Sequence, residues 1–563
     1  MQETIWIIYP SGQQAERISA ELGLPLAISK VLVNRRISDP EKASNFLYLS
    51  LDDLHNPYQM KDMRKAVKRV KEAIVRREKI LIFGDYDVDG ILSIVILTKA
   101  LQSLGAEVSY FIPNRLKDGY GIKEKYMDIV EKNQARLVIS VDCGIKATRF
   151  VSQARRKGID VIISDHHQPG SELPSALAIL NPVLPDCGYP DNRLAGVGVV
   201  FKLIQALLDG YQRSSQLSSY LKMVSIATIA DVAELRGENR LLVKFGLENL
   251  DGTSNIGLNS LLDICRLRGK KISVGDVGFR LGPRINAAGR MGEADQAVKL
   301  FFAESFQEAE ELARSLDTMN SKRQRIEENI YNQALNRIKS RQLDQRYRFL
   351  VMGCEQWHRG IIGIVASKLK DKFHRPVLLF AYKDSHAYGS GRSIKEFPLI
   401  NCLDEYKDLF ISYGGHTLAV GCELEREKIL TLKQAVNSYA ESRLTAEDLK
   451  RKIYIDAELN FSELSSSFLD KYWLLAPFGI GNPKPFFLTR GAEIIAQPQK
   501  LQGKHSKLWL KQKNRIFEAL AWGRGDWAET LFRGERIDLV YSLQFSRYLG
   551  EDKISLAVED IKF

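Results

Sequence analysis

Three short apolar runs of the sequence end in acids or histidines. The first leads into Gly84–Gly90, which contains three aspartates, the second into Asp142, and the third into the triplet Asp165–His167. Carboxylates and imidazoles are ligands that divalent cations favour, and a pair of such ions can hydrolyse a phosphate ester. The pattern therefore predicts a metal-assisted reaction on a phosphate ester.

Asp87 and Asp89 stand two residues apart where an expected strand turns into a helix. A regular strand would point them to opposite sides, whereas an irregular turn lets both carboxylates face one point. An Asx turn with a helix N-cap explains one aspartate of this segment but not three. We expect Asp142 to bridge two ions, and one of the two adjacent histidines to ligate metal while the other donates to phosphate.

A sheet is needed to bring these segments together. Strands are expected at 79–84, 107–112, 136–141, 160–164 and 177–180, with amphipathic helices between them. This alternation predicts a parallel sheet with right-handed crossovers, and ligands of such sheets collect outside the carboxyl ends of the strands.

The rest of the chain predicts an α/β multidomain protein. A helix over 305–340 contains neither glycine nor proline and is expected to connect two domains, a second α/β unit begins near Arg348, and strand alternation from about residue 450 predicts a small β-barrel. The expected domains are an N-terminal extension (1–55), a catalytic domain (56–300), a connecting helix (301–343), a smaller α/β domain (344–445) and the barrel (446–563).

Composition narrows the class of protein. The 563 residues carry 81 Lys and Arg against 69 Asp and Glu, a net charge of +12, which favours a polyanionic partner. The basic helix around 64–77 is expected to be a solvated face. Six cysteines without a C-x-x-C pair indicate neither a disulfide framework nor a zinc knuckle. No membrane span or signal peptide is visible, so we expect no membrane association and a cytoplasmic location.

Two glycine-rich loops are candidates for phosphate binding. They are Gly389–Ser393, with Ser390 and Arg392, and the triplet of Gly414, Gly415 and His416. Glycines let backbone amides approach an anion, and Arg392 can bind phosphate with two hydrogen bonds. Alternatively, the glycines only make turns.

Three further groups could contact nucleic acid. Arg284, Asn286 and Arg290 form a polar patch, although each could instead make a salt bridge or a cap. His358 is expected to face substrate, whereas its neighbour Trp357 is expected in the core. Basic residues interleave with an aromatic at Lys504, Lys507 and Trp509, as in a single-strand stacking groove. The alternative reading places Trp509 inside the barrel and the lysines outside.

Several of these motifs together resemble the DHH phosphoesterase superfamily. They are Gly84–Gly90, Asp142–Gly144, Asp165–His167 and Asp231, of which Asp231 alone would be taken for a helix cap. Within that superfamily the sequence is most similar to the RecJ family of single-strand-specific DNA exonucleases, above all in Leu281–Met291.

The resemblance implies a function and a set of site residues. It implies a 5′→3′ exonuclease of DNA repair and recombination that releases 5′ mononucleotides, with DHH, DHH-associated and OB-like domains. Two Mn²⁺ or Mg²⁺ ions would be bound by Asp87, Asp89, Asp142, His166 and Asp231, with Asp85 a less certain ligand. His167 would contact the scissile phosphate, and Arg115, Ser390 and Arg392 would hold the 5′ phosphate. The implied partners are single-stranded DNA, a single-strand-binding protein and a repair helicase.

Three alternatives remain. A DHH-family phosphodiesterase for short oligonucleotides or cyclic dinucleotides would lack both the 284–290 segment and the barrel. A single-strand-binding protein with a vestigial metal site would not need the complete set of ligands. An inorganic pyrophosphatase shares the metal chemistry but needs neither a barrel nor the +12 charge.

Overall fold

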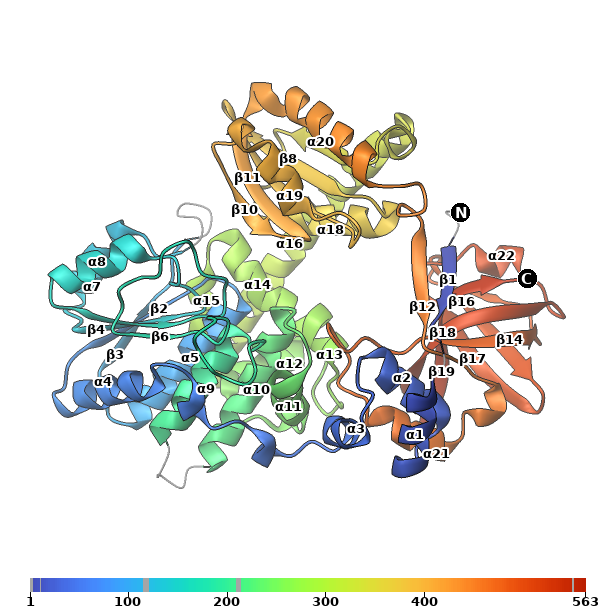
Figure 1. Cartoon of the computed structure of the whole chain (residues 1–563), viewed down its shortest axis with the longest axis horizontal. Coiled ribbons are helices and arrows are strands. Elements are labelled where there is room, and N and C mark those ends of the chain that lie inside the picture. The colour runs from blue at the N-terminus through green and yellow to red at the C-terminus, as the bar shows by residue number, and fades with distance from the viewer. Residues whose placement is uncertain (1–3, 11, 115–120, 209–213, 549–550) are drawn as a thin grey trace. The chain divides into compact units, whose positions relative to one another are not determined.

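The computed structural model describes residues 4–10, 12–114, 121–208, 214–548 and 551–563, and they form two compact units (Figure 1). The first contains His55–Ala233 and Phe245–Arg451. The second joins Thr4–Leu54, Glu234–Lys244 and Lys452–Phe563. The segment expected as an N-terminal extension therefore packs with the C-terminal part of the chain, and a piece of the expected catalytic domain joins it.

A five-stranded parallel sheet forms the first half of the larger unit. Its order is β3-β2-β4-β5-β6. The strands are β2 (Ile80–Gly84), β3 (Val108–Phe111), β4 (Leu137–Val141), β5 (Asp160–Ser164) and β6 (Ala178–Leu180). The five predicted strands are confirmed. The chain order reverses direction between β2 and β4, and such a switch point opens a crevice at the carboxyl ends of the two strands.

Helices cover both faces of this sheet (Figure 1). One face carries α7 (Met127–Lys132) and α8 (Thr148–Arg156), the other α4 (Met63–Val75), α5 (Val88–Ser103) and α9 (Gly196–Leu208). The helices that follow are α10 (Ser214–Ala230), α11 (Gly237–Leu247), α12 (Ile256–Ile264), α13 (Val274–Asp276), the π-helix η5 (Val277–Leu281), α14 (Gly282–Met291) and α15 (Ala294–Phe302). Both central strands and α5 are buried almost throughout, as their apolar sequences require.

The helix α4 corrects one expectation. Its basic side chains were predicted to form a solvated face, but Arg69 is buried. Its guanidinium contacts Asp160 and Glu78, each at 2.6 Å. A buried arginine needs such partners because water no longer solvates its charge.

The long helix α16 (Phe306–Ser340) connects the two halves of the larger unit, as predicted. Ala309, Ala313 and Leu316 are buried near its start, whereas Ile330, Ala334 and Ile338 pack into the core of the second half. The helix therefore contributes to both cores as well as joining them.

The second half contains a mixed sheet in the order β10-β11-β9-β8-β7. Its strands are β7 (Leu350–Cys354), β8 (Val377–Lys383), β9 (His386–Arg392), β10 (Ser412–His416) and β11 (Ala419–Glu425), and its helices are α17 (Leu343–Arg346), α18 (Ile362–Phe373), α19 (Leu399–Glu405) and α20 (Ile429–Arg443). The helices α16 and α18 cover one face over β7 and β8, and α19 and α20 cover the other.

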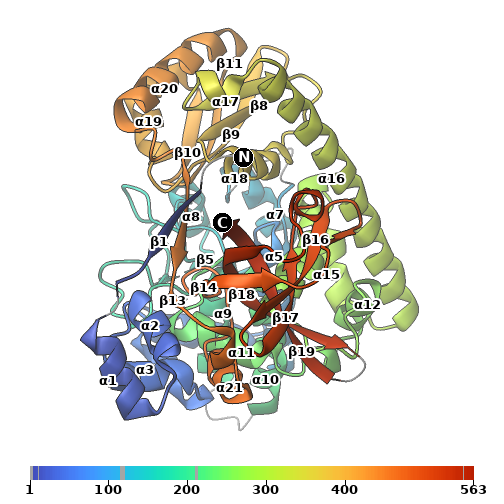
Figure 2. The same ribbon diagram turned by 90° about the vertical axis from the view of Figure 1, so that its right-hand side faces the viewer.

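The smaller unit contains a closed β-barrel, which confirms the predicted one (Figure 2). The ring runs β14-β16-β17-β19-β18 and back to β14, with β17 and β19 parallel. This is the arrangement of an OB-fold. The helices and strands of the unit include β1 (Thr4–Ile8), α1 (Gln13–Leu22), α2 (Leu26–Asn34), α3 (Pro40–Leu47), most of α11, β12 (Arg451–Ile455), β13 (Ala457–Glu458), α21 (Ser466–Trp473), β14 (Phe487–Ile494), β15 (Gln499–Leu501), β16 (His505–Gln512), β17 (Arg515–Ala521), α22 (Trp527–Thr530), β18 (Arg536–Tyr548) and β19 (Glu551–Lys562).

Side chains from α1, α2 and α3 complete the core of the barrel unit. The strand β1 pairs with β12. None of the helices that the structure describes has the length and apolarity to cross a membrane.

Candidate metal centre and phosphate-binding surfaces

Two aspartates of the loop between β2 and α5, Asp87 and Asp89, have different roles. Asp87 caps α5, because its Oδ1 accepts hydrogen bonds from the amides of Asp89 and Gly90 at 3.0 and 3.1 Å. Asp89 lies in the first turn of the helix and is 1% exposed. The capping interpretation is thus correct for Asp87, and the same turn directs Asp89 to the sheet edge.

The start of α9 holds the Asp89 carboxylate. Its two oxygens accept from the amides of Gly196 and Val197 at 2.8 and 2.7 Å. A helix N-terminus suits this task because its first amides lack partners within the helix. A β-carbon on Gly196 would lie 2.7 Å from Oδ1 of Asp142, so only glycine leaves room for both carboxylates. Gly196 and Val197 were not among the predicted site residues.

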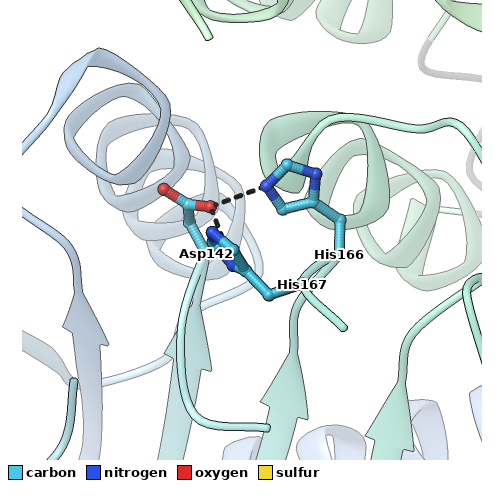
Figure 3. Close-up of side chains that lie close together, drawn as sticks. All are labelled: Asp142, His166 and His167. Atoms are coloured by element: carbon cyan, nitrogen blue, oxygen red, sulfur yellow. Dashed lines mark ion pairs between the residues drawn. The ribbon is translucent and has the colours of Figure 1, made fainter. Parts of the chain in front are cut away.

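Asp142 follows β4 directly and has a left-handed backbone with φ of 57°. Few residues other than glycine adopt this conformation, and it occurs often at functional sites. The carboxylate is 2% exposed, and its Oδ1 lies 3.2 Å from Nε2 of His166 and 4.0 Å from Nδ1 of His167 (Figure 3). The conformation aims the side chain at both histidines.

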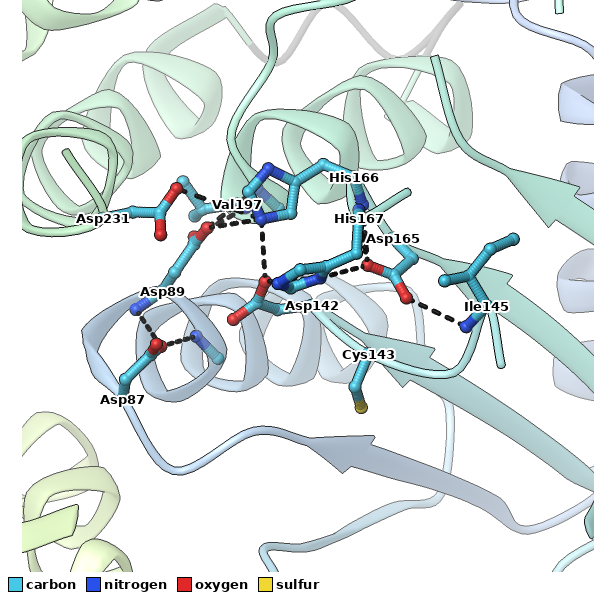
Figure 4. Close-up of polar contacts among 12 residues, drawn as sticks. Asp87, Asp89, Asp142, Cys143, Ile145, Asp165, His166, His167, Val197 and Asp231 are labelled. Carbon is cyan, nitrogen blue, oxygen red and sulfur yellow. Dashed lines mark hydrogen bonds and ion pairs between the residues drawn. The ribbon is translucent and has the colours of Figure 1, made fainter. Parts of the chain in front are cut away.

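Asp165 positions His167. Its Oδ1 lies 2.7 Å from Nδ1 of the imidazole and also accepts from the amides of both histidines, while Oδ2 accepts from the amide of Ile145 (Figure 4). Burial of the ring opposes its protonation, but the hydrogen bond to Asp165 and the charges of Asp165, Asp85 and Asp87 together outweigh this and raise the pKa of His167. Asp165 was not among the predicted site residues, although it stands directly before both histidines.

Three overlapping groups of side chains could hold cations. Within each, one ligand atom per residue lies within 4.8 Å of the others: Asp142, His166 and His167; Asp89, His166 and Asp231; Asp85, Asp87 and Asp142. The predicted ligands therefore meet at the switch point of the sheet. Asp231 comes from the end of α10, with its Oδ2 3.9 Å from Nε2 of His166.

Electrostatics show that this cluster fits divalent cations. Burial, followed by the charge of Asp87, raises the pKa of Asp89 to about 7, and burial raises the pKa values of Asp142 and Asp231. Burial and the neighbouring His167 lower the pKa of His166 to about 4, so its imidazole is neutral at pH 7. The buried Nε2 of His166 has no hydrogen-bond partner among the described residues. Neutral imidazole and crowded carboxylates are stabilised by a bound cation.

The helix α14 packs against the first metal loop. A β-carbon on Gly289 would overlap the carbonyl oxygen of Tyr86, and the side-chain oxygen of Asn286 accepts from the amide of Val88 at 3.3 Å. Arg284 is paired with Asp317, and Arg290 donates to the carbonyl of Gly360 at 3.0 Å. Residues of α14 thus pack against and support the loop between β2 and α5. The predicted contacts of Arg284, Asn286 and Arg290 with substrate stay a prediction.

One face of the mixed sheet is left open over β11 and β10, next to β9, against which Gly363 of α18 lies. Strand pairing aligns Ser390 with Gly421 and Gly414, and Arg392 with Ala419 and His416. This is the face that α16 and α18 cover over β7 and β8, where Leu379 and Val377 pair with the same two residues of β9. A β-carbon on Gly414 or Gly421 would meet open space.

This open face suits an anion. Arg392 donates to the carbonyl of Gly391 at 2.7 Å and to Oγ of Ser390 at 3.3 Å, which places the hydroxyl and the guanidinium together. By strand alternation Gly415 belongs to the opposite face. Arg115, predicted to complete this pocket, lies outside the described residues.

Trp357 and His358 differ in burial, as predicted. Trp357 is 4% exposed and donates from Nε1 to Gln333, whereas His358 is half-buried. Nδ1 of His358 accepts from the amide of Gly360 at 3.1 Å. Burial, followed by the charge of Lys322, lowers the pKa of His358, so the ring is neutral at pH 7. Its contact with substrate stays a prediction.

The barrel places Trp509 outside its core. Leu508 and Leu510 are buried, so the alternating Lys507 and Trp509 belong to the outer face of β16. Nζ of Lys507 lies 5.2 Å from the Trp509 ring centre and is paired with Glu518. The alternative that put Trp509 inside is wrong. Lys504 is exposed just before β16.

Comparison with known proteins agrees with this architecture. Family models match residues 79–228 (DHH family, N-terminal domain), 346–442 (DHHA1 domain) and 455–560 (RecJ OB domain). Two curated relatives are the single-stranded-DNA-specific exonucleases RecJ of Bacillus subtilis, 35% identical over 98% of this chain and 70% of the relative, and of Dickeya dadantii, 31% identical over 98% and 99%. The crystal structure of RecJ in complex with Mn²⁺ from Thermus thermophilus superimposes with a TM-score of 0.84 at 29% identity, covering all of this chain and 80% of that one.

The parallel sheet, the aspartate–histidine cluster at its switch point and the match to the DHH family model define a phosphoesterase of the DHH class. The relatives and the three domain matches narrow this class further. The chain belongs to the RecJ family of single-stranded-DNA-specific exonucleases.

Proposed function

We propose that this protein is a metal-dependent exonuclease that removes 5′ mononucleotides from single-stranded DNA in the 5′→3′ direction, in DNA repair and recombination. The observation that carries the proposal is the buried cluster of aspartates with His166 and His167 at the carboxyl ends of β2, β4 and β5. Family membership supplies the polymer substrate, since its curated members are named for single-stranded DNA.

We infer that two divalent cations, Mn²⁺ or Mg²⁺, are held by Asp85, Asp87, Asp89, Asp142, His166 and Asp231. When bound, such ions lower the pKa of water and offset charge on phosphate oxygens. The chain itself orients these ligands: amides of α9 hold Asp89, and the left-handed backbone of Asp142 turns its carboxylate inward.

His167 is the proposed contact of the scissile phosphate. Its Nδ1 is bonded to Asp165, which favours the imidazolium form and leaves Nε2–H to donate to a phosphate oxygen. A charged donor of this kind stabilises negative charge that develops in the transition state.

The open sheet face is the proposed pocket for the 5′ phosphate. Ser390, Arg392 and the glycines of β10 and β11 offer donors and space, and Arg115 and His416 complete the set. An anion pocket for a chain end determines polarity, because a strand entering by its 3′ end has no terminal phosphate to place there. We keep Arg284, Asn286, Arg290 and His358 as proposed backbone contacts.

The outer face of β16 and β17 in the barrel is the proposed path of the strand. OB-folds bind oligonucleotides on the face of their second and third strands, which here carries Lys507 and Trp509 beside Lys504. A single-strand-binding protein, a repair helicase and a cytoplasmic location also belong to this proposal.

The test uses single- and double-stranded DNA labelled at the 5′ or the 3′ end, in Mn²⁺. Wild type is expected to release labelled mononucleotide from the 5′ end of single strands first. Asp142→Ala should be inactive, whereas the control Asp128→Ala, an exposed acid on α7, should match wild type. Earlier release of the 3′ label, or an active Asp142→Ala, would overturn the proposal. Equal turnover of dinucleotides and long strands would favour a short-oligonucleotide phosphodiesterase.

A further inference from the structure

Two large apolar side chains are exposed beside the metal centre. Phe279 is 84% exposed and Val232 is 61% exposed. Single exposed apolar residues need no explanation, but these two line one pocket of about 310 Å³. Val232 directly follows the proposed ligand Asp231, so the pocket adjoins the metal centre.

Both residues stand on unusual backbone. Phe279 lies within the π-helix η5, and Val232 has a left-handed φ of 65°, which a β-branched residue rarely adopts. Single π-turns and strained residues of this kind cluster at functional sites. Ordinary helical backbone would be lower in energy at either position. A functional role for the two side chains would explain why the strained backbone is kept.

The pocket extends from the metal centre towards the proposed 5′-phosphate pocket. Its opposite wall includes Ile364 of α18, whose neighbour Gly363 lies against the open sheet face. A β-carbon on Gly363 would be 2.8 Å from Oγ of Ser390 and 3.2 Å from Nη2 of Arg392. A nucleotide whose 5′ phosphate lies at Ser390 and whose 3′ phosphodiester lies at the metals would have its base beside this pocket.

The lining of the pocket suits any of the four bases. Phe279, Val232 and Pro283 offer apolar surface. Most polar groups of the wall already have partners: Arg323 bonds Glu327 and Asn320, Arg290 bonds the carbonyl of Gly360, and Oδ1 of Asn286 accepts from the amide of Val88. A π-face can stack on the aromatic ring whichever base it belongs to, whereas reading a base edge would require unengaged donors and acceptors.

We propose that this pocket holds the nucleobase of the 5′-terminal nucleotide, with Phe279 stacked on its face. The proposal rests on the exonuclease function and adds a positioning residue to it. Stacking orders the terminal nucleotide, so that its 3′ phosphodiester lies at the metal centre. Its loss is expected to lower kcat/KM roughly tenfold, which is within the range for one base–aromatic stack.

The test combines Phe279→Ala with a strand whose 5′-terminal nucleotide lacks its base. Single-turnover release of that first nucleotide is measured for intact and abasic strands. In wild type, removal of the base should cost about tenfold. Phe279→Ala should lose about tenfold on the intact strand and nothing further on the abasic one, and Phe279→Trp should retain activity.

Phe306→Ala is the matched control, because Phe306 is 68% exposed on α16 and outside the lining of this pocket. It should behave as wild type on both strands. If Phe279→Ala lost a further tenfold on the abasic strand, the two rate reductions would be independent and the pocket would be refuted. Wild-type rates in Phe279→Ala on the intact strand would also refute it.

A second readout separates this inference from the exonuclease function. A strand with terminal 2-aminopurine is bound to Asp142→Ala in Mn²⁺, and its fluorescence is followed. If the strand's fluorescence is quenched on binding to Asp142→Ala but not on binding to the double variant Asp142→Ala/Phe279→Ala, the pocket is supported. The same fluorescence with both proteins contradicts it. If wild type released no nucleotide from intact strands, the proposed function would fail, and this binding experiment would still decide the pocket.

Discussion

The carboxylate of Asp165 and the imidazole of His167 form a partly buried hydrogen bond of 2.7 Å, and it favours the charged form of the histidine. Asp165 also accepts three backbone amides. Burial raises its pKa, but the hydrogen bond and charge of His167, together with the amides of Ile145 and His167, outweigh this and hold the pKa below the usual range. The pair therefore keeps a negative charge next to a ring that the proposed mechanism needs as a cation.

Replacing Asp165 by asparagine removes this charge and should lower the pKa of His167. Because the imidazolium form is present below that pKa, the alkaline decline of kcat/KM should move to lower pH. Loss of the charged donor should cost roughly a hundredfold in kcat at pH 8. The pH–rate profile measures both effects. Asp160→Asn should leave the profile unchanged, because Asp160 lies at the start of β5, which Asp165 follows, and is paired with Arg69. An unshifted profile in Asp165→Asn would refute the role of the pair.

Cation binding should release protons. In the metal-free protein Asp89 keeps a proton up to about pH 7, and Asp142 and Asp231 also have raised pKa values. Because the folded state holds these protons more tightly than the unfolded chain, metal-free stability falls as pH rises from about 4 towards 7. Mn²⁺ should bind more tightly, and raise the melting temperature more, at pH 8 than at pH 6.

Calorimetric titration in two buffers of different ionisation enthalpy checks this linkage. More protons should be released per ion at pH 6 than at pH 8. Equal affinity at both pH values, with no proton release, would mean that the carboxylates are already ionised without metal.

Gly196 should be essential for metal affinity. A methyl group there would press on the Asp142 carboxylate, and Gly196→Ala is expected to weaken Mn²⁺ binding roughly tenfold to a hundredfold. Gly198→Ala, two residues further along α9, would press only on the Leu194 side chain and should bind normally. Calorimetry compares the two variants. Equal affinities would show that the crowding at Gly196 is relieved elsewhere.

Arg240 should be required for stability of the barrel unit. It is 1% exposed, donates to the carbonyls of Leu474 and Leu475 at 2.9 and 2.8 Å, and lies 3.9 Å from the ring centre of Phe46. Arg240→Ala leaves buried carbonyls unpaired and a cavity, so we expect a loss of about 3 kcal/mol or more in unfolding free energy. Differential scanning calorimetry measures it. Arg490→Ala, an exposed arginine of the same unit, should cost under about 1 kcal/mol; similar losses in both would refute the role.

The predictable parts of the fold have strong local signals. The five strands of the parallel sheet, the long helix and the barrel each have a hydrophobic pattern of their own, and the structure confirms them. The ligand cluster was predictable because parallel strands bring their carboxyl ends together.

Other features depend on contacts that are distant in sequence. The amides of Gly196 and Val197 carry no side-chain signal, yet they hold Asp89 more than a hundred residues away. The segment from Thr4 to Leu54 packs with the barrel through complementary apolar surfaces. The hydrophobic pattern of one segment does not show which other segment it packs against. The burial of Arg69 was not predicted because one of its two acidic partners, Asp160, comes from β5, about 90 residues further along the chain.

Metal titration tests most directly whether the cluster around Asp142 is a two-cation hydrolytic centre. Mn²⁺ is titrated into chelator-treated wild type while bound ions per chain and release of 5′ mononucleotide are measured in the same samples. We expect two ions per chain, activity that appears as the second ion binds, and loss of both ion binding and activity in Asp142→Asn. Full activity without metal, or in protein whose cluster binds no metal, would rule out a two-cation centre.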